Sequence, residues 1–424
     1  MKTDIVIVGC GAAGLYCALN LPSDRNVVIV TKDKMEKSDS FLAQGGICVL
    51  YDENDYSSFY EDTMRAGHYE NNPESVNLMI RSSRSVINDL VKYGVRFEKN
   101  GEDFVYTKEG AHSRPRILFH EDETGKEITS HLLEQVKKLS NVTIIEDYTM
   151  VDIICRDNIC YGIIGHDKEL NFSTIMADYT ILATGGIGGL FKHSTNYRHL
   201  TGDALAIALK HNIKLQHIDY IQIHPTTFYD KKGGREFLIS ESVRGEGAIL
   251  LNDKGERFVD ELQPRDVVAN AIYEEMNKQG SEHVWLSMKP IDAKEIKTHF
   301  PNIYQHCLDA GYDVTKEPIP VVPSQHYFMG GIDVDKNSKT SMERLYAAGE
   351  TACNGVHGKN RLASNSLLES LVFAKRAAIK IIEEYTPTEF NEDIVIDRNI
   401  YKNYKEEYKK AVLSAIEKER KNHE

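Results

Sequence analysis

The stretch that decides the fold is Thr3-Asp-Ile-Val-Ile-Val-Gly9-Cys-Gly11-Ala-Ala-Gly14. Asp4 to Val8 is a short run of mostly β-branched residues, which is typical of a buried parallel strand. It passes directly into Gly9-x-Gly11-x-x-Gly14, and Leu15 to Leu21 is expected to continue as an apolar helix. The glycines permit a tight turn, a close approach of the backbone to a pyrophosphate and packing of the helix on the strand. The stretch therefore predicts a dinucleotide site at a helix N-terminus, against the alternative of a glycine-rich turn without a ligand.

A second strand is predicted from Asn26 to Thr31, and it ends in Thr31-Lys32-Asp33. A nicotinamide site usually places an acidic residue for the ribose at the end of this strand, about 20 residues after the glycines. Because this strand ends in Thr31-Lys32 and not in an acidic residue, the sequence argues against a simple NAD site. It leaves open a flavin nucleotide whose ribose is held in another way.

Length and charge restrict the class of protein. A chain of 424 residues can bury two cores, or form one large domain with an insertion. The net charge of -13 disfavours nucleic acid and anionic membranes as partners, but a small anionic substrate remains possible. No apolar run approaches the roughly 18 residues of a membrane span, and Met1-Lys2 leads straight into a strand, so no signal peptide is expected. The seven cysteines are scattered; Cys155 and Cys160 are the nearest useful pair, and we expect reduced thiols in a cytoplasmic protein, with no metal site.

The order of predicted elements indicates an interrupted α/β domain. Strands return at Val142 and at Ala177, a helix capped by Thr201 or Asp203 follows, and Arg344 to Glu350 again reads as a strand that ends in glycine. We expect a Rossmann-like domain from residues 1–217 and 328–385, an inserted capping domain at 218–327 and a short helical C-terminal segment at 386–424. The reactive centre would lie between cap and dinucleotide domain.

Four stretches resemble the succinate dehydrogenase/fumarate reductase flavoprotein family: Ala43-Gln-Gly-Gly46, Gln222-Ile-His-Pro-Thr226, Arg244-Gly-Glu-Gly247 and Arg361-Leu-Ala-Ser-Asn-Ser-Leu-Leu-Glu369. The similarity runs from residue 1 to about residue 385, and within the family the chain is most similar to the branch that oxidises L-aspartate. The resemblance implies an FAD-binding domain with an inserted α+β cap, and hydride transfer between flavin N5 and a C4 dicarboxylate.

The resemblance also implies a set of FAD contacts. Respiratory members bond the flavin to a histidine five residues before the glutamine of the Ala43–Gly46 motif, but here that position is Asp39, so non-covalent FAD is expected. Glu350 would accept from a hydroxyl of the cofactor, with a helix cap as the alternative role. The FAD-binding residues would be Gly9, Gly11, Ala12, Ala13 and Gly14 at the pyrophosphate, Lys32, Ser40, Phe41, Leu42, Ala43, Gln44, Gly45 and Gly46 along the ribityl chain and isoalloxazine, and Asp203, Glu350, Ser366 and Leu367.

L-Aspartate carries two carboxylates and an ammonium, so its site needs donors at both ends and an anion near the amine. Arg361 suits a carboxylate because its planar fork binds bidentately, and His224, His326 and Ser240 can donate hydrogen bonds. These four residues match the dicarboxylate-binding positions of the family. A lone histidine is more often structural, and the chain has 16.

The residue type at the position of Glu109 distinguishes the branches of the family. Its segment, Lys108 to Arg114, resembles the one that brings a glutamate to the substrate amine in the aspartate-oxidising branch, where succinate and fumarate enzymes have a neutral glutamine. The alternative is a solvated loop glutamate.

Arg265 matches the catalytic arginine of the family, which donates or accepts a proton. Arginine is a poor base, with an ordinary pKa above about 12, so the role needs help from neighbouring charges. Glu241 and Arg244 match the relay positions. The alternative for Arg265 is a local ion pair with Asp266 or Asp260.

The resulting hypothesis is oxidation of L-aspartate to iminoaspartate, with oxygen or fumarate as the electron acceptor. In the family, the imine feeds quinolinate synthase in de novo NAD biosynthesis, so functional association with that enzyme is expected. One competing hypothesis is a soluble fumarate reductase or succinate dehydrogenase subunit, and the other is a non-enzymatic flavin-binding protein.

Overall fold

The glycine-rich stretch begins at the centre of a seven-stranded sheet in the computed structural model, which describes residues 1–231, 234–389 and 394–423. The first strand pairs in parallel with its neighbours on both sides, and an antiparallel hairpin extends the sheet at one edge. This mixed α/β sheet with a parallel centre confirms the predicted fold class. In spatial order the strands are β7 (Val142–Ile145), β2 (Val27–Val30), β1 (Lys2–Val8), β10 (Phe172–Leu182), β9 (Ile159–His166) and β8 (Thr149–Arg156), with β18 (Leu345–Ala347) also paired to β10.

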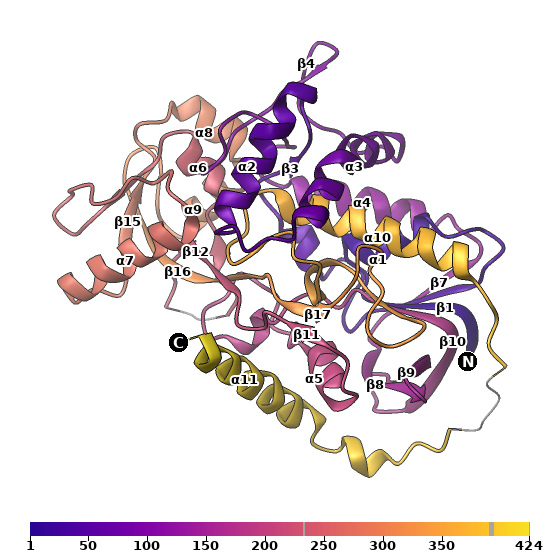
Figure 1. The fold of residues 1–424 in the computed structure, drawn as a ribbon. Coiled ribbons are helices and arrows are strands. Elements are labelled where there is room, and N and C mark those ends of the chain that lie inside the picture. Colours follow the sequence, from indigo (N-terminus) through magenta and orange to yellow (C-terminus); the bar gives the residue numbers. More distant parts are fainter. Residues whose placement is uncertain (232–233, 390–393, 424) are drawn as a thin grey trace.

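Alternating residues of β1 supply two separate cores. Ile5 and Ile7 belong to one core with the helices on one face of the sheet, and Val6 and Val8 belong to a second core on the other face. Figure 1 shows α1, α3, α4 and α10 on one side, and α5 and α11 on the other. The helices of the first side are α1 (Ala12–Leu19), α2 (Tyr56–Ala66), α3 (Pro73–Lys92), α4 (Thr124–Val136) and α10 (Asn365–Glu384).

The second side holds α5 (Asp203–Lys210) and the C-terminal α11 (Tyr404–His423). The predicted cap of α5 is wrong: Gly202 is the N-cap, with φ of 68°, and neither Thr201 nor Asp203 caps the helix. α11 is not simply a surface helix, because it buries a stripe of side chains at intervals of four residues in the second core. That stripe is Tyr404, Tyr408, Val412 and Ile416.

The cap is a separate antiparallel sheet with its own core, at the left in Figure 1. The chain enters it on β12 and leaves it on β16, and these two strands pair with each other, with Ile221 opposite Phe328. The division into residues 1–217 with 328–385, 218–327 and 386–424 stays a prediction, and this sheet lies within its middle part. The cap elements are β12 (Ile221–Phe228), β13 (Phe237–Leu238), α6 (Glu241–Gly245), β14 (Ile249–Leu251), α7 (Arg265–Gln279), β15 (Val284–Ser287), α8 (Ala293–His299), α9 (Pro301–Asp309) and β16 (Ile319–Phe328).

The remaining elements of the described chain are short. They are η1 (Asp39–Leu42), β3 (Ile47–Cys48), η2 (Glu53–Asp55), β4 (Lys99–Asn100), β5 (Asp103–Phe104), β6 (Ile117–Leu118), η3 (Gly188–Leu190), β11 (Leu215–Gln216), β17 (Gly331–Asp333), η4 (Gly349–Thr351), β19 (Ala352–Cys353) and η5 (Arg398–Tyr401).

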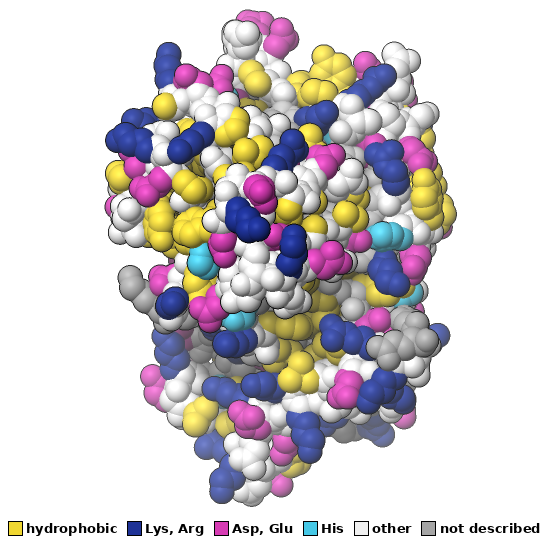
Figure 2. Space-filling model, turned by 90° about the vertical axis from the view of Figure 1, so that its left-hand side faces the viewer, with side chains coloured by type: hydrophobic (Ala, Val, Ile, Leu, Met, Phe, Trp, Pro, Cys, Tyr) yellow, Lys and Arg dark blue, Asp and Glu magenta, His cyan; other side chains and the backbone are white. Residues whose placement is uncertain are grey.

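The surface on the cap side mixes acidic and basic side chains, and a hollow with hydrophobic side chains crosses its middle (Figure 2). Among the described residues, none of the helices combines the length and apolar character needed to cross a bilayer.

Candidate active site

One continuous cavity runs from the glycine turn after β1 to the cap. Most of the predicted site residues line it, including Glu109 and Arg361 from the first domain and His224 and Arg265 from the cap. Gly14, Phe41 and Arg244 are predicted site residues outside this lining. The others that line it are Gly9, Gly11, Ala12, Ala13, Lys32, Ser40, Leu42, Ala43, Gln44, Gly45, Gly46, Asp203, Ser240, Glu241, His326, Glu350, Ser366 and Leu367.

The glycine turn is packed too tightly for side chains. Gly9 has φ of +121°, and a Cβ there would lie 1.9 Å from the carbonyl oxygen of Ala183. A Cβ on Gly14 would lie 2.1 Å from the oxygen of Gly9, which explains why Gly14 belongs to the motif without reaching the cavity. The backbone N–H of Ala12, at the start of α1, donates to Ser40 Oγ at 3.1 Å. The turn therefore has the close packing that a pyrophosphate cradle requires.

Lys32, which follows β2, forms an ion pair with Asp203. Lys32 Nζ donates to Asp203 Oδ2 at 2.7 Å, to Thr201 Oγ1 at 2.9 Å and to the carbonyl of His199 at 2.8 Å. These bonds occupy the three donors of an ammonium group. Lys32 thus fixes the position of Asp203, and one oxygen of Asp203 also accepts from Thr201.

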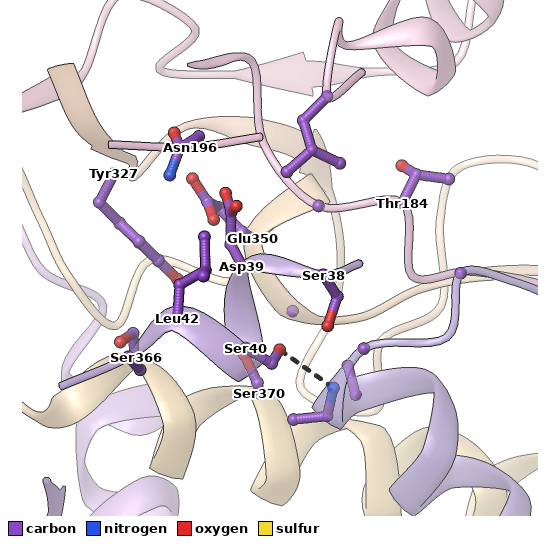
Figure 3. Close-up of a pocket in the computed structure, with 18 of the residues that line it drawn as sticks. Ser38, Asp39, Ser40, Leu42, Thr184, Asn196, Tyr327, Glu350, Ser366 and Ser370 are labelled. Atoms are coloured by element: carbon purple, nitrogen blue, oxygen red, sulfur yellow. Dashed lines mark hydrogen bonds between the residues drawn. The ribbon is translucent and has the colours of Figure 1, made fainter. Parts of the chain in front are cut away.

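Two half-buried carboxyl groups face the middle of the cavity, where Figure 3 shows Asp39 and Glu350 lying close together. Burial and the charge of Asp39 raise the pKa of Glu350 to about 8, and burial raises the pKa of Asp39 to about 7. Glu350 Oε1 accepts from the N–H of Phe328 at 3.0 Å, so it is not a helix cap. Four buried cavity atoms, on Ser38 (Oγ), Asp39 (Oδ2), Gln44 (Oε1) and Asn196 (Oδ1), have no protein partner in the described part of the chain. A polar nucleotide with several hydroxyls fits this set.

The cap end of the cavity is rich in donors. The N–H of Thr226 donates to His224 Nδ1 at 3.1 Å, and the carbonyl of Thr226 already accepts from Ile239. His224 therefore carries its proton on Nε2, which is buried without a partner among the described residues. Burial and the nearby Arg265 hold the pKa values of His224 and His326 well below 6.5, so both rings are neutral donors at pH 7.

Arg361 adds a cation to these neutral donors. Its Nη1 donates to Ser366 Oγ at 3.0 Å, whereas its Nε is buried with no partner in the described chain. Burial and the charge of Arg265 lower the pKa of Arg361 to about 10, which leaves it charged at pH 7. The arrangement has the character of a carboxylate receptor.

Glu109 is not a solvated loop residue, because it is only 3% exposed. Its two oxygens accept from Ser242 Oγ at 2.8 Å and from Ser364 Oγ at 2.5 Å. Burial and the charge of Glu241 raise its pKa above the ordinary value. In the described part of the chain, Glu109 forms no ion pair, and it lines the same cavity as Arg361 and Arg265.

Arg265 is paired with Glu241 instead of Asp266 or Asp260. Its Nε donates to Glu241 Oε2 at 2.5 Å, and its Nη1 donates to Gln222 Oε1 at 2.9 Å. Arg244 Nη2 lies 3.7 Å from the same oxygen of Glu241. Burial alone would raise the pKa of Glu241, but the two arginines lower it below the ordinary value. The three side chains form a row that leads away from the cavity.

Sequence reasoning missed the residues that hold this site in shape. Gln222, Ser242 and Ser364 orient Arg265 and Glu109. Gln222 and Ser364 lie inside the quoted motifs, which was the available signal, and Ser242 lies two residues before one of them. Ser364 has φ of +60°, a strained conformation that is frequent at functional sites. Asn196 and Tyr327 also line the cavity; Tyr327 directly follows the predicted His326, whereas no motif marked Asn196.

Comparison with known proteins decides the family. The model of the FAD binding domain family matches residues 4–367. The L-aspartate oxidase of Clostridium perfringens is 54% identical over 379 residues, which cover 89% of this chain and 86% of that protein. The chain belongs to the L-aspartate oxidase family. A second member, from Clostridium acetobutylicum, is 52% identical over 92% of this chain and 91% of its own length.

Solved structures agree with this family assignment. The chain is similar to an E. coli quinol fumarate reductase with a TM-score of 0.86 and 26% identity, covering all of this chain and 74% of that one. The predicted resemblance to the succinate dehydrogenase/fumarate reductase flavoproteins is confirmed. This chain therefore shares its fold with that fumarate reductase flavoprotein.

Proposed function

We propose that this chain oxidises L-aspartate to iminoaspartate with non-covalently bound FAD. The observation that carries the proposal is the buried Glu109 carboxylate in the same cavity as Arg265 and Arg361. An ammonium between Glu109 and the arginines would neutralise the one charge that a plain dicarboxylate leaves unpaired. FAD supplies an acceptor for the hydride of the substrate Cα at flavin N5.

The residues of the chain bind, orient and deprotonate the substrate. Arg361 and the neutral histidines His224 and His326, with Ser240, would hold the carboxylates. Glu109 would accept from the ammonium and so turn Cα towards the cofactor side of the cavity. Arg265 would take a proton of the amine only as it passes its own Nε proton to Glu241, the oxygen of which accepts from that Nε and lies 3.7 Å from Arg244.

Two electron acceptors are proposed. Oxygen would give hydrogen peroxide, and fumarate would give succinate; the second agrees with the similarity to a fumarate reductase. The reaction would be the first step of de novo NAD biosynthesis through quinolinate. Because an imine hydrolyses readily, we propose functional association with quinolinate synthase. We also propose a cytoplasmic location, since all seven cysteines are free thiols.

The test is anaerobic bleaching of the flavin absorbance by L-aspartate and, separately, by succinate. Bleaching by aspartate alone supports the proposal. Bleaching by succinate with no response to aspartate refutes it and favours a fumarate reductase or succinate dehydrogenase activity.

A further inference from the structure

A cysteine, a histidine and an aspartate lie in a row on the far side of the sheet from α10. Cys155 Sγ, near the end of β8, is 3.2 Å from His211 Nδ1, directly after α5. His211 Nε2 is 2.7 Å from Asp152 Oδ1. None of these three residues lines the cavity of the proposed active site. The row therefore needs an explanation of its own.

The imidazole of this row is charged at neutral pH. Its hydrogen bonds to Asp152 and to Cys155 raise the pKa of His211 to about 9. The facing groups are Asp152, Cys155, Lys210 and Tyr401; Lys210 Nζ and the Tyr401 hydroxyl both donate to the second oxygen of Asp152, at 2.5 and 2.8 Å. An imidazolium beside a sulfur is a feature of reactive cysteines.

Access also distinguishes Cys155. It is partly exposed, whereas the other six cysteines are buried. A thiol reacts readily with a small oxidant when it lies beside a positively charged group and is accessible from solvent. Cys155 meets both conditions.

A second thiol, that of Cys160, lies on the neighbouring strand directly opposite Cys155. β8 and β9 form a hairpin with the two-residue turn Asp157-Asn158, both at positive φ, and Cys155 is the partner of Cys160 in the register. The N–H of Cys160 donates to the carbonyl of Glu343, so it does not bond across to Cys155. Such a non-hydrogen-bonded pair has its Cα atoms about 4.5 Å apart, within the range that a disulfide spans.

We propose that Cys155 and Cys160 form a peroxide-reactive thiol pair, with Cys155 as the attacking thiol, His211 as its charge partner and Cys160 as the resolving thiol. Cys155 sulfur attacks the O–O bond of hydrogen peroxide; an S–O bond forms and the O–O bond breaks. The leaving hydroxide takes a proton from His211 to become water, and His211 takes the thiol proton of Cys155 in its place. Cys160 sulfur then attacks Cys155 sulfur; the S–S bond forms, the S–O bond breaks, and the second hydroxide leaves as water with the proton of Cys160. The two sulfurs lose two electrons, and peroxide gains them.

The order of the two steps follows from burial. Burial raises the pKa of Cys160 to about 11, so it remains a protonated thiol until Cys155 has been oxidised. The site is one helix away from the proposed cofactor site, because α5 begins at Asp203 in the cavity and ends beside His211. The cellular source of the peroxide rests on the proposed function, but its reaction with the thiols does not.

The experiment treats the reduced, FAD-loaded full chain with on the order of one molar equivalent of hydrogen peroxide. Free thiols are then blocked, and the peptides are mapped by mass spectrometry. The expected result is a Cys155–Cys160 disulfide that dithiothreitol reverses. In Cys160→Ser, dimedone should label Cys155. In Cys155→Ser, Cys160 should remain reduced.

A histidine variant tests the role of the imidazole. His211→Gln should slow oxidation of Cys155 by at least about tenfold, whereas the matched control His299→Gln, at an exposed position of the cap, should not. The inference is overturned if Cys155 reacts no faster than buried Cys353 in the wild-type sample, or if His211→Gln reacts at the wild-type rate. Added peroxide separates the two proposals. A protein that forms the disulfide but whose flavin is not bleached by aspartate refutes the proposed function alone. A protein whose flavin is bleached by aspartate but which forms no disulfide refutes this inference alone.

Discussion

Exchanging Glu109 for glutamine removes one charge from the site and leaves its shape almost unchanged. The two serine hydroxyls that donate to Glu109, at 2.8 and 2.5 Å, can rotate to serve an amide oxygen and an amide N–H. What is lost is a charge-assisted contact to the substrate ammonium, which contributes about 1.5–3 kcal/mol. At 1.36 kcal/mol per factor of ten, kcat/KM for L-aspartate should fall roughly 10- to 150-fold.

Succinate provides the opposite expectation. It has no ammonium, so in the wild-type protein it would leave Glu109 buried and unpaired, which costs several kcal/mol. Glu109→Gln should therefore raise kcat/KM for succinate while lowering it for aspartate. Initial rates with both substrates, together with flavin content and melting temperature, measure this change. Glu246→Gln is the matched control, because this glutamate is partly exposed and does not line the cavity.

The pH profile gives an independent readout. Because burial and Glu241 raise the pKa of Glu109, its carboxylate is lost at a higher pH than that of an ordinary glutamate as the solution is acidified. The acid limb of kcat/KM for aspartate should lie above the ordinary glutamate range and disappear in Glu109→Gln. An unchanged rate and profile in a folded, FAD-loaded Glu109→Gln protein would refute the assignment of the ammonium to this residue.

Three further changes test other parts of the structure. Arg116→Met should lower the free energy of unfolding by about 3–5 kcal/mol in urea titrations, because the fully buried guanidinium pairs with Asp55 at 2.9 Å and Asp62 at 2.7 Å; an unchanged midpoint contradicts this. Lys32→Met should raise the dissociation constant of FAD roughly tenfold in equilibrium dialysis by freeing Asp203, and equal affinity excludes the role. Arg361→Lys should lower kcat/KM for aspartate at least about tenfold, since lysine lacks the planar fork; wild-type rates would rule out a bidentate contact.

Local patterns predicted the parts of the fold that depend on local physics. The strand, the glycine turn and the helix from residue 2 to residue 19 follow from β-branching and the space that glycine leaves. The sequence predicted a helix for α11 but not its buried stripe, because the second core that the stripe joins includes strands more than 200 residues earlier.

Contacts between residues far apart in the sequence determine the roles of Asp203 and Glu109, which the sequence alone left open. Asp203 looked like a helix cap, yet its side chain binds Lys32, which lies 171 residues away. Glu109 looked equally able to be a solvated loop residue, and what excludes that alternative is its contact with Ser364, 255 residues further along the chain. Such partners have no spacing that a single sequence reveals, so the identity of the site was predictable from motifs while its charge pairing was not.

The two chain connections of the cap lie side by side along one edge, because the chain enters it at Ile221 and leaves it beside that residue at Phe328. A body held along one edge has one easy motion, a rotation about that edge. Such a rotation would carry His224 and Arg265 away from Glu109 and Arg361 in a single movement. Receptor and proton acceptor therefore assemble together or not at all, and the frequency of cap closure sets an upper limit on the turnover rate.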